Sequence, residues 1–270
     1  MITTLAGAPA RPLGLAAYPE QQRACVRVAH AAGVNFFFFY SISHESLIDG
    51  LAPVLRRARD DVIVATGSGS RNRKGLERAR RAICRRLGVE TLDVFFAEYV
   101  SPSDDFPRVF DDAGVLDLLC EWRETGAIRY VGASAHDRDL ARRLVDDGRV
   151  DVLMHRFNMA HRKAAASVFP AAEAAGIPVV AFTATRWRTL LDGHPDWSGP
   201  VPSAADCYRY CLAAPAVQVV LSAPATTAQL RANLTVLQDG RADPSATADW
   251  DAYGDLVYAA GRDRFETMWS

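Results

Sequence analysis

The chain has 270 residues, of which 49% are hydrophobic and 23% are charged. Its 31 Lys and Arg are balanced by 32 Asp and Glu, so the formal net charge is −1. This composition is typical of a globular protein with a large core, and it excludes the basic surface that nucleic-acid and membrane-surface binding require. We therefore expect a small-molecule substrate and neither nucleic acid nor membrane as a partner. The sequence carries no signal for an oligomeric state.

The amino-terminal stretch and the cysteines predict a cytoplasmic location. Residues 1–15 contain no basic lead followed by an apolar segment, and the chain has no run of about 18 apolar residues. The five cysteines are scattered, odd in number and without a CxxC pair, which fits reduced thiols. Cys207 and Cys211 lie four residues apart on a predicted helix, and we interpret them as packing residues rather than metal ligands.

Short apolar runs alternate with longer segments of helical period along the chain. The predicted strands are residues 13–18, 35–40, 62–67, 92–100, 128–134, 150–158, 178–185 and 217–223. The predicted helices are residues 19–33, 44–60, 72–88, 114–126, 137–149, 162–176, 203–215 and 227–239. Such alternation is expected of parallel βα units.

Eight βα units in 270 residues predict an α/β fold, a (β/α)8 TIM barrel, because a doubly wound sheet more often has five or six strands. We expect residues 1–270 to form this single barrel, with residues 241–270 as a C-terminal extension. Barrels of this type build their sites at the carboxyl ends of the strands. The active mouth is therefore expected there.

Several motifs, taken in chain order, resemble those of the aldo-keto reductases. GVNFFFFYSISHE, residues 33–45, resembles the family's second-strand pattern G-x-N-F-F-D-T-A-x-x-Y-G. LDVFFAE, GAIRYVGAS, VDVLMHRFN and GIPVVAF resemble the fourth, fifth, sixth and seventh strands. The resemblance covers nearly the whole barrel and implies the family's fold, with NADPH-dependent carbonyl reduction as the ancestral activity.

The same resemblance implies that the catalytic tetrad of Asp, Tyr, Lys and His is replaced. Aligned without gaps, the four positions hold Phe38, Ser43, Gly67 and Glu98. A reductase needs a tyrosine acid, supported by the lysine, to protonate the alkoxide that hydride transfer creates. Tyr40 lies three positions from the expected site and could be rebuilt into it by a loop shift.

The cofactor contacts implied by the resemblance are only partly kept, so NADPH is a possible cofactor. Met154 and Ala135 stand where a Gln and an Asn would hold the nicotinamide amide. Ser134 is retained and Phe182 could stack on the ring. Gln229 and Asn233 match the phosphate-side helix, whose amino terminus could receive an anion through free backbone NH groups.

Strand alternation predicts which side chains face the mouth. Phe36, Phe38 and Tyr40 are expected on one face of the second strand, Phe96 and Glu98 on the fourth, and Met154, Arg156 and Asn158 on the sixth. The following loops add His44, Ser68, Arg71, His136, His161, Arg186 and Trp187.

Glu98 and His136 are the candidate proton carriers. A carboxylate beside phenylalanines would be desolvated and its pKa raised toward the range of a general acid or base, but Glu98 could instead pair with Arg156. His136 could carry a proton, or cap the next helix with Asp137. A metal held by His155, His161 and Glu98 is not expected, because the spacing matches no ligand pattern and His155 should face away from Arg156.

Two loops offer candidate anion contacts. Arg186 and Trp187 follow the seventh strand, where a cation and a flat aromatic could clamp an anionic or planar ligand, or simply stabilise the loop. The GSGSRNRKG turn carries Arg71 at a predicted helix start, where it could cradle a phosphate or carboxylate or serve as a flexible connection.

Three hypotheses follow for the function. The first is non-redox acid/base chemistry, such as elimination, isomerisation or cyclisation, on a small anionic metabolite. Glu98 would act as the acid or base with Tyr40 or His136, and Arg156 and Arg186 would hold the substrate. The second is an NADPH-dependent carbonyl reductase with a rebuilt proton donor. The third is a catalytically silent binding or scaffold protein.

Overall fold

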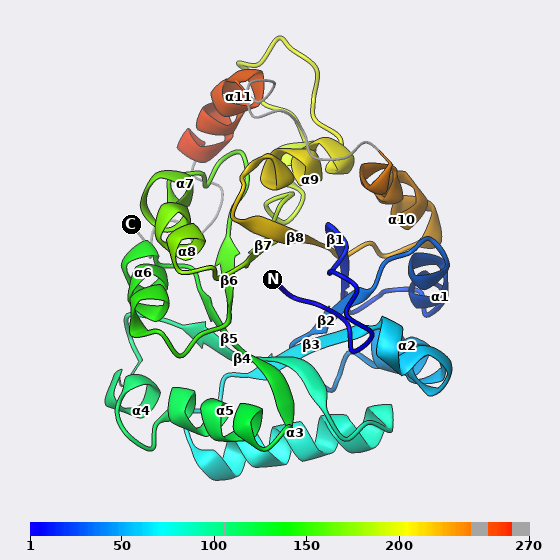
Figure 1. Ribbon diagram of the computed structural model, residues 1–270. Coiled ribbons are helices and arrows are strands. Elements are labelled where there is room, and N and C mark those ends of the chain that lie inside the picture. The colour runs from blue at the N-terminus through cyan, green and yellow to red at the C-terminus, as the bar shows by residue number, and fades with distance from the viewer. Residues whose placement is uncertain (105, 239–247, 261–270) are drawn as a thin grey trace.

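The computed structural model describes residues 1–104, 106–238 and 248–260 and confirms the predicted (β/α)8 barrel (Figure 1). Eight parallel strands close in sequence order, each pairing with its neighbours along the chain and β1 with β8. They are β1 (Leu13–Ala16), β2 (Phe36–Phe39), β3 (Ile63–Ser68), β4 (Leu92–Val100), β5 (Ile128–Ala135), β6 (Val152–Arg156), β7 (Val179–Phe182) and β8 (Val217–Ser222).

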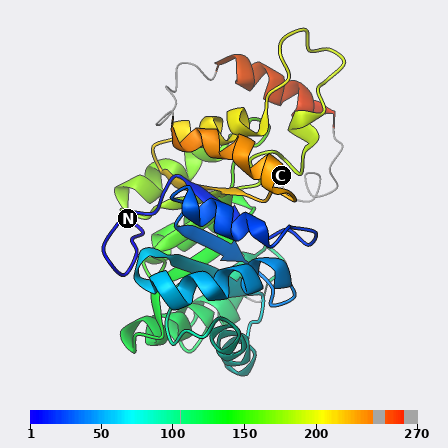
Figure 2. The ribbon, with the colours of Figure 1, turned by 90° about the vertical axis from the view of Figure 1, so that its right-hand side faces the viewer.

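Helices form the outer ring that Figures 1 and 2 show around the strands. They are α1 (Ala24–Ala31), α2 (Glu45–Ala58), α3 (Arg73–Leu87), α4 (Phe106–Phe110), α5 (Val115–Glu124), α6 (Arg138–Asp147), α7 (Ala164–Ser167), α8 (Phe169–Ala174), α9 (Ala204–Ala213), α10 (Thr227–Asn233) and α11 (Ala248–Ala259), with short 3-10 turns at 59–61, 189–191 and 234–237. The predicted helix 162–176 is divided into α7 and α8, because Pro170 begins a new helix. Within the described ranges, no helix is both long and apolar enough to span a bilayer.

The four consecutive phenylalanines of β2 fill two different cores. Phe36 and Phe38 belong to the cluster inside the barrel, whereas Phe37 and Phe39 belong to the layer between the strands and the helices. Side chains on a strand alternate between faces, and in a parallel barrel both faces are buried. The unbroken apolar run is therefore what a barrel strand requires.

The amino-terminal end of the barrel carries the structural polar contacts. Asp93, at the start of β4, is buried and pairs with Arg59 and Arg129, each at 2.9 Å. Thr3 and Pro9 form an antiparallel bridge, and Ile2 is buried with the inner-barrel cluster, so the first residues close this end (Figure 1). These contacts leave the opposite, carboxyl end as the place for a site.

Helix α11 packs outside the barrel near α7 and α9 (Figure 1). The Tyr253 hydroxyl donates to the carbonyl of Leu190, and Asp255 pairs with Arg162. Gly254 lies directly against the backbone of Met159, in the loop after β6. Residues 241–247 and 261–270 of the predicted C-terminal extension lie outside the described residues.

Gly254→Ala is expected to lower the free energy of unfolding by about 1–3 kcal/mol, because the added methyl would collide with the Met159 backbone. Thermal unfolding followed by circular dichroism measures the change. Gly69→Ala is the matched control, since nothing lies within 4 Å of its added methyl and its backbone conformation suits alanine. A Gly254→Ala melting temperature equal to that of the control would contradict the described packing of α11.

Candidate active site

The site begins where four strands, β2, β4, β6 and β7, end on the inside of the barrel. The inner-barrel cluster reaches its carboxyl end at Phe38, Phe96 and Met154, with Phe182 packed against it. Alternation places Glu98 on the same side as Phe96, and Arg156 on the same side as Met154. Arg156 and Phe182 are direct neighbours across β6 and β7. An acid, a cation and aromatic rings therefore share this end of the barrel.

Glu98 occupies space that a side chain at position 67 would need. Gly67 of β3 pairs with Phe96 of β4. A methyl added at Gly67 would lie 2.6 Å from Cγ of Glu98 and would collide with the carbonyl oxygen of Phe96. The position where the resemblance places a lysine therefore admits glycine alone. The missing side chain makes room for the Glu98 carboxyl.

The Glu98 carboxyl lies in a dry environment. Burial raises its pKa from 4.5 to about 8, and the charge of Arg71 opposes this shift only partly. Its Oε1 atom is buried and receives no hydrogen bond from any residue that the structure describes. The rings of Phe38 and Phe96 meet edge to face nearby, 5.9 Å apart. No ion pair joins Glu98 to Arg156 within the described residues, so that predicted alternative is not what the structure contains.

His136 follows β5 and is a neutral imidazole over most of the pH range. Burial lowers its pKa to about 3, with smaller contributions from the charges of Arg156 and His155. Its ring lies edge-on to Tyr99 and Phe182, with centroids at 5.1 and 5.0 Å. Its buried Nδ1 has no hydrogen-bond partner in the described part of the chain. The helix-capping role belongs to Asp137, whose carboxylate accepts from the Leu140 amide.

Arg156 is the cation next to the histidines that follow β5 and β6. It is buried, and its charge contributes to lowering the pKa of both His136 and His161. Burial is the larger cause for His161, whose pKa falls to about 2. His155 points the other way, as predicted, with its Nδ1 2.8 Å from the carbonyl oxygen of Ala135.

Two residues predicted to face the mouth are placed differently, because their strands end earlier than expected. Strand β2 stops at Phe39, and Tyr40 is 55% exposed, with its ring against His44 at 4.4 Å. Strand β6 stops at Arg156, and Asn158 is fully buried. Its side chain donates to the carbonyl of Thr183 and accepts from the amides of Ala160 and His161. Asn158 therefore fixes two loops.

Arg186 and Trp187 lie in a turn with unusual backbone geometry. Three successive residues have positive φ, namely Arg186 at 48°, Trp187 at 49° and Arg188 at 79°. Arg186 is fully buried and donates a hydrogen bond to the carbonyl of Val257 in α11. The Trp187 side chain is 47% exposed. The turn thus directs the cation to the C-terminal helix and leaves the aromatic at the surface.

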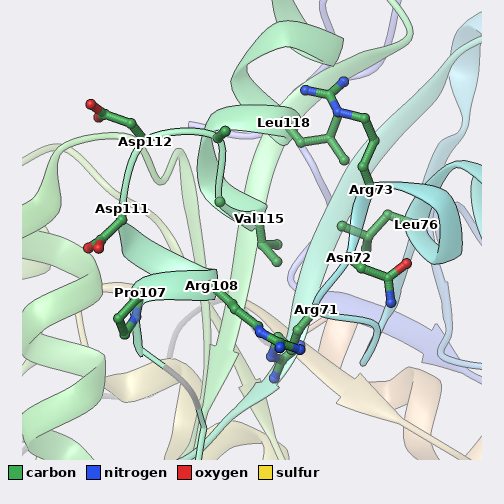
Figure 3. Close-up of a pocket in the computed structure, with 12 residues that line it drawn as sticks. Arg71, Asn72, Arg73, Leu76, Pro107, Arg108, Asp111, Asp112, Val115 and Leu118 are labelled. Carbon is green, nitrogen blue, oxygen red and sulfur yellow. The ribbon is translucent and has the colours of Figure 1, made fainter.

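Arg71 lines a cleft that residues of α3, α4 and the start of α5 surround. Figure 3 shows it next to Arg108, and Leu76 and Val115 also line the cleft. The cleft has a volume of about 350 Å³. The Arg71 guanidinium donates to both carboxylate oxygens of Asp104 and to the carbonyls of Glu98 and Tyr99. These bonds use Nε and Nη2, whereas Nη1 is buried and has no hydrogen-bond partner among the described residues.

Tyr99 and Asp104 were not predicted as site residues. Only a polar loop after the fourth strand hinted at Asp104, and no local pattern predicts that the strand bulges at Tyr99.

The residues expected to hold NADPH are engaged in other contacts. Ser134 accepts a hydrogen bond from the amide of Tyr99. Asn233 is buried and donates to the side chains of Ser222 and Tyr208. Met154 and Ala135 offer no amide group for a nicotinamide.

The turn before α10 also lacks the free NH groups predicted for a phosphate. Gln229 accepts from the amides of Ala225 and Thr226 through its side chain, and its own amide donates to the Thr226 hydroxyl. Gln22 accepts from the amide of Thr227. Four amides of the turn are therefore taken by side chains. The prediction of a free helix terminus is therefore wrong at these four positions.

Comparison with known proteins identifies the fold and the family. The model of the Aldo/keto reductase family matches residues 13–193. An aldo-keto reductase from Bacillus halodurans in its holo form superposes with a TM-score of 0.73 at 16% identity, covering 91% of each chain. An aldo/keto reductase from Klebsiella pneumoniae, in complex with NADP and acetate, gives 0.73 at 16% identity, covering 94% of this chain and 95% of the other.

At such identities the solved structures establish the barrel alone, and none of the curated proteins matches the sequence. The family match, in contrast, spans more than half of the chain and includes the first seven strands, from which Phe38, Gly67 and Glu98 come. The chain belongs to the aldo-keto reductase family.

Proposed function

We propose that this protein is an enzyme that carries out non-redox acid/base chemistry, such as elimination, isomerisation or cyclisation, on a small anionic metabolite. The observation that carries this proposal is the Glu98 carboxyl, buried at the mouth in space left by Gly67 and with an unbonded oxygen. A pKa of about 8 keeps this group mainly protonated near neutral pH, with part of it ionised. It can therefore donate or accept a proton.

His136 is the favoured partner of Glu98. Its imidazole has a buried Nδ1 without a described partner. Burial lowers its pKa to about 3, so the ring stays uncharged while Glu98 changes protonation. Tyr40, the other candidate, is mostly exposed. Arg156 supplies positive charge close to His136, which favours a carboxylate or phosphate on the substrate. Phe38 and Phe182 provide the apolar walls, and Trp187 lies at the rim.

Family membership favours one alternative, an NADPH-dependent carbonyl reductase with a rebuilt proton donor. Two observations weigh against it. The neutral Glu98 carboxyl stands without a lysine, because a side chain at Gly67 would collide with it. Four amides at the β8–α10 turn are already bonded to side chains.

Glu98→Gln is expected to lower turnover by about 10²- to 10⁴-fold, because the amide cannot exchange a proton while it keeps the shape of the acid. The purified protein would be incubated without cofactor with a panel of small carboxylates and phosphate esters, and substrate loss followed by mass spectrometry. The control is Glu77→Gln, which removes an acid that pairs with Arg81 on the outside of α3. Full activity in Glu98→Gln would sink the assignment, and no turnover by the native protein would favour a silent binding protein.

NADPH at about 1 mM is expected to leave both the melting temperature and the cofactor fluorescence unchanged, since a ligand stabilises only the state it binds. The NADP-binding Klebsiella pneumoniae enzyme serves as the positive control in the same buffer. A saturable rise in melting temperature with this protein would instead support the reductase.

The contribution of Glu98 to the stability of the protein is expected to fall as pH rises from about 4.5 to about 8, the window between the ordinary and the native pKa of this group. In this window the native state binds the proton that the unfolded chain has lost, so the slope of stability against pH is negative. Glu98→Gln should remove this loss, so at about pH 9 its melting temperature should be higher than that of the native protein. At about pH 4 no such gain is expected. Equal gains at both pH values would show that the effect is not ionisation, and Glu77→Gln is again the control.

A further inference from the structure

The strand that carries Glu98 is distorted at that residue. Across β4 and β5, Ala97 faces Ala133, but the next pairing joins Val100 to Ala135, so two residues of β4 stand opposite Ser134 alone. The second of them, Tyr99, has a φ of 53°. Such bulges redirect side chains, and a left-handed non-glycine residue persists only where its surroundings hold it. We call residues 98 and 99 the Glu98 bulge.

Hydrogen bonds hold the Glu98 bulge from two sides. On the β5 side, the Ser134 hydroxyl accepts from the amide of Tyr99 at 2.7 Å. On the β3 side, the Arg71 guanidinium donates to the carbonyl of Glu98 at 2.9 Å and to that of Tyr99 at 3.0 Å. Arg71 thus binds the backbone of Glu98, while the Oε1 atom of that residue has no described partner.

Asp104 completes the arrangement by holding Arg71. Its two carboxylate oxygens accept from the Arg71 guanidinium at 2.9 and 3.0 Å, and one of them also accepts from the amide of Ser101. The side chains of Arg71 and Asp104 are only 13% and 16% exposed. Burial acts to raise the pKa of Asp104, but the bonds from Arg71 and Ser101 outweigh it, so the net shift is downward and the pair stays ionised.

We propose that Arg71 and Asp104 are a positioning pair, in which Arg71 holds the Glu98 bulge and Asp104 offsets the charge of Arg71 next to the Glu98 carboxyl. Arg71 then fixes the direction of the acid without forming an ion pair with it. The role of the pair in catalysis rests on the proposed function of Glu98. The effect of the pair on the ionisation of the Glu98 carboxyl does not.

Of the cations at this end of the barrel, it is Arg71 whose charge acts on the pKa of Glu98, whereas Arg156 on β6 acts on the pKa values of His136 and His161. Strands β2 and β3 contribute Phe38 and Gly67, which are uncharged. Strand β5 and its loop contribute Ser134 and His136, and the latter is neutral above about pH 3. Arg71 is the cation that acts on the pKa of Glu98. The two halves of the pair should therefore move this pKa in opposite directions.

The test is a pH titration of Glu98 in the whole protein, followed by carbon NMR with glutamate labelled at the carboxyl carbon. The Glu98 signal is assigned by its loss in Glu98→Gln. Arg71→Met removes the cation and leaves the Asp104 charge, so the Glu98 pKa should rise by about one unit or more. Asp104→Asn leaves the Arg71 charge uncompensated, so the pKa should fall by a similar amount. Because asparagine nearly matches aspartate in shape, the second variant decides the sign even if Arg71→Met does not fold.

The matched control is the ion pair of Arg73 and Glu121. Arg73 is the first residue of α3, two positions after Arg71, and Glu121 lies in α5. The two bonds of this pair measure 2.7 Å, but its side chains are 48% and 51% exposed. Arg73→Met and Glu121→Gln should leave the Glu98 titration where it is. Shifts of opposite sign in Arg71→Met and Asp104→Asn support the positioning pair, and no shift or shifts of the same sign overturn it. The free protein is titrated, so this outcome is independent of whether Glu98→Gln loses activity.

Discussion

Steric exclusion at Gly67 is the constraint from which the rest of the mouth follows. In a closed barrel, neighbouring strands are fixed by their register, so a side chain at Gly67 and the side chain of Glu98 compete for one volume. A lysine and an inward carboxyl cannot both fit there. Glycine at position 67 and the inward side chain of Glu98 therefore depend on each other. The ring of Phe38 lies edge to face with that of Phe96 in the same part of the barrel.

A carboxyl with a buried, unbonded oxygen is costly, and the surrounding structure determines how the cost is met. At neutral pH the group remains mainly protonated, so the expensive charge is avoided. The left-handed Tyr99 adds further strain of roughly 1–2 kcal/mol, which Ser134 and Arg71 offset through the backbone. At the other end of the barrel, Asp93 is buried and paired with two arginines.

The sequence was sufficient to predict the barrel, since apolar runs and helical segments alternate at the period that parallel units require. Alternation also predicts that Phe96 and Glu98 lie on one face, because the strand stays regular up to Ala97, but it does not predict the bulge at residues 98 and 99. Prediction failed where a strand ended. Tyr40 and Asn158 continue the alternation of the sequence, but β2 and β6 end before them. Asp104 was missed because its partner, Arg71, is 33 residues away in the chain.

The electrostatics of the mouth connect an anionic substrate with proton transfer. Burial and, to a smaller extent, the charge of Arg156 lower the pKa of His136, while Glu98 stays mainly neutral near pH 7 because it is desolvated. A substrate carboxylate or phosphate next to Arg156 would screen that cation and so make the His136 imidazole more basic. The same negative charge would hold Glu98 in its protonated form. In the proposed function, binding of the anion therefore moves the two groups toward complementary roles, with the imidazole as the acceptor and the carboxyl as the donor of the proton.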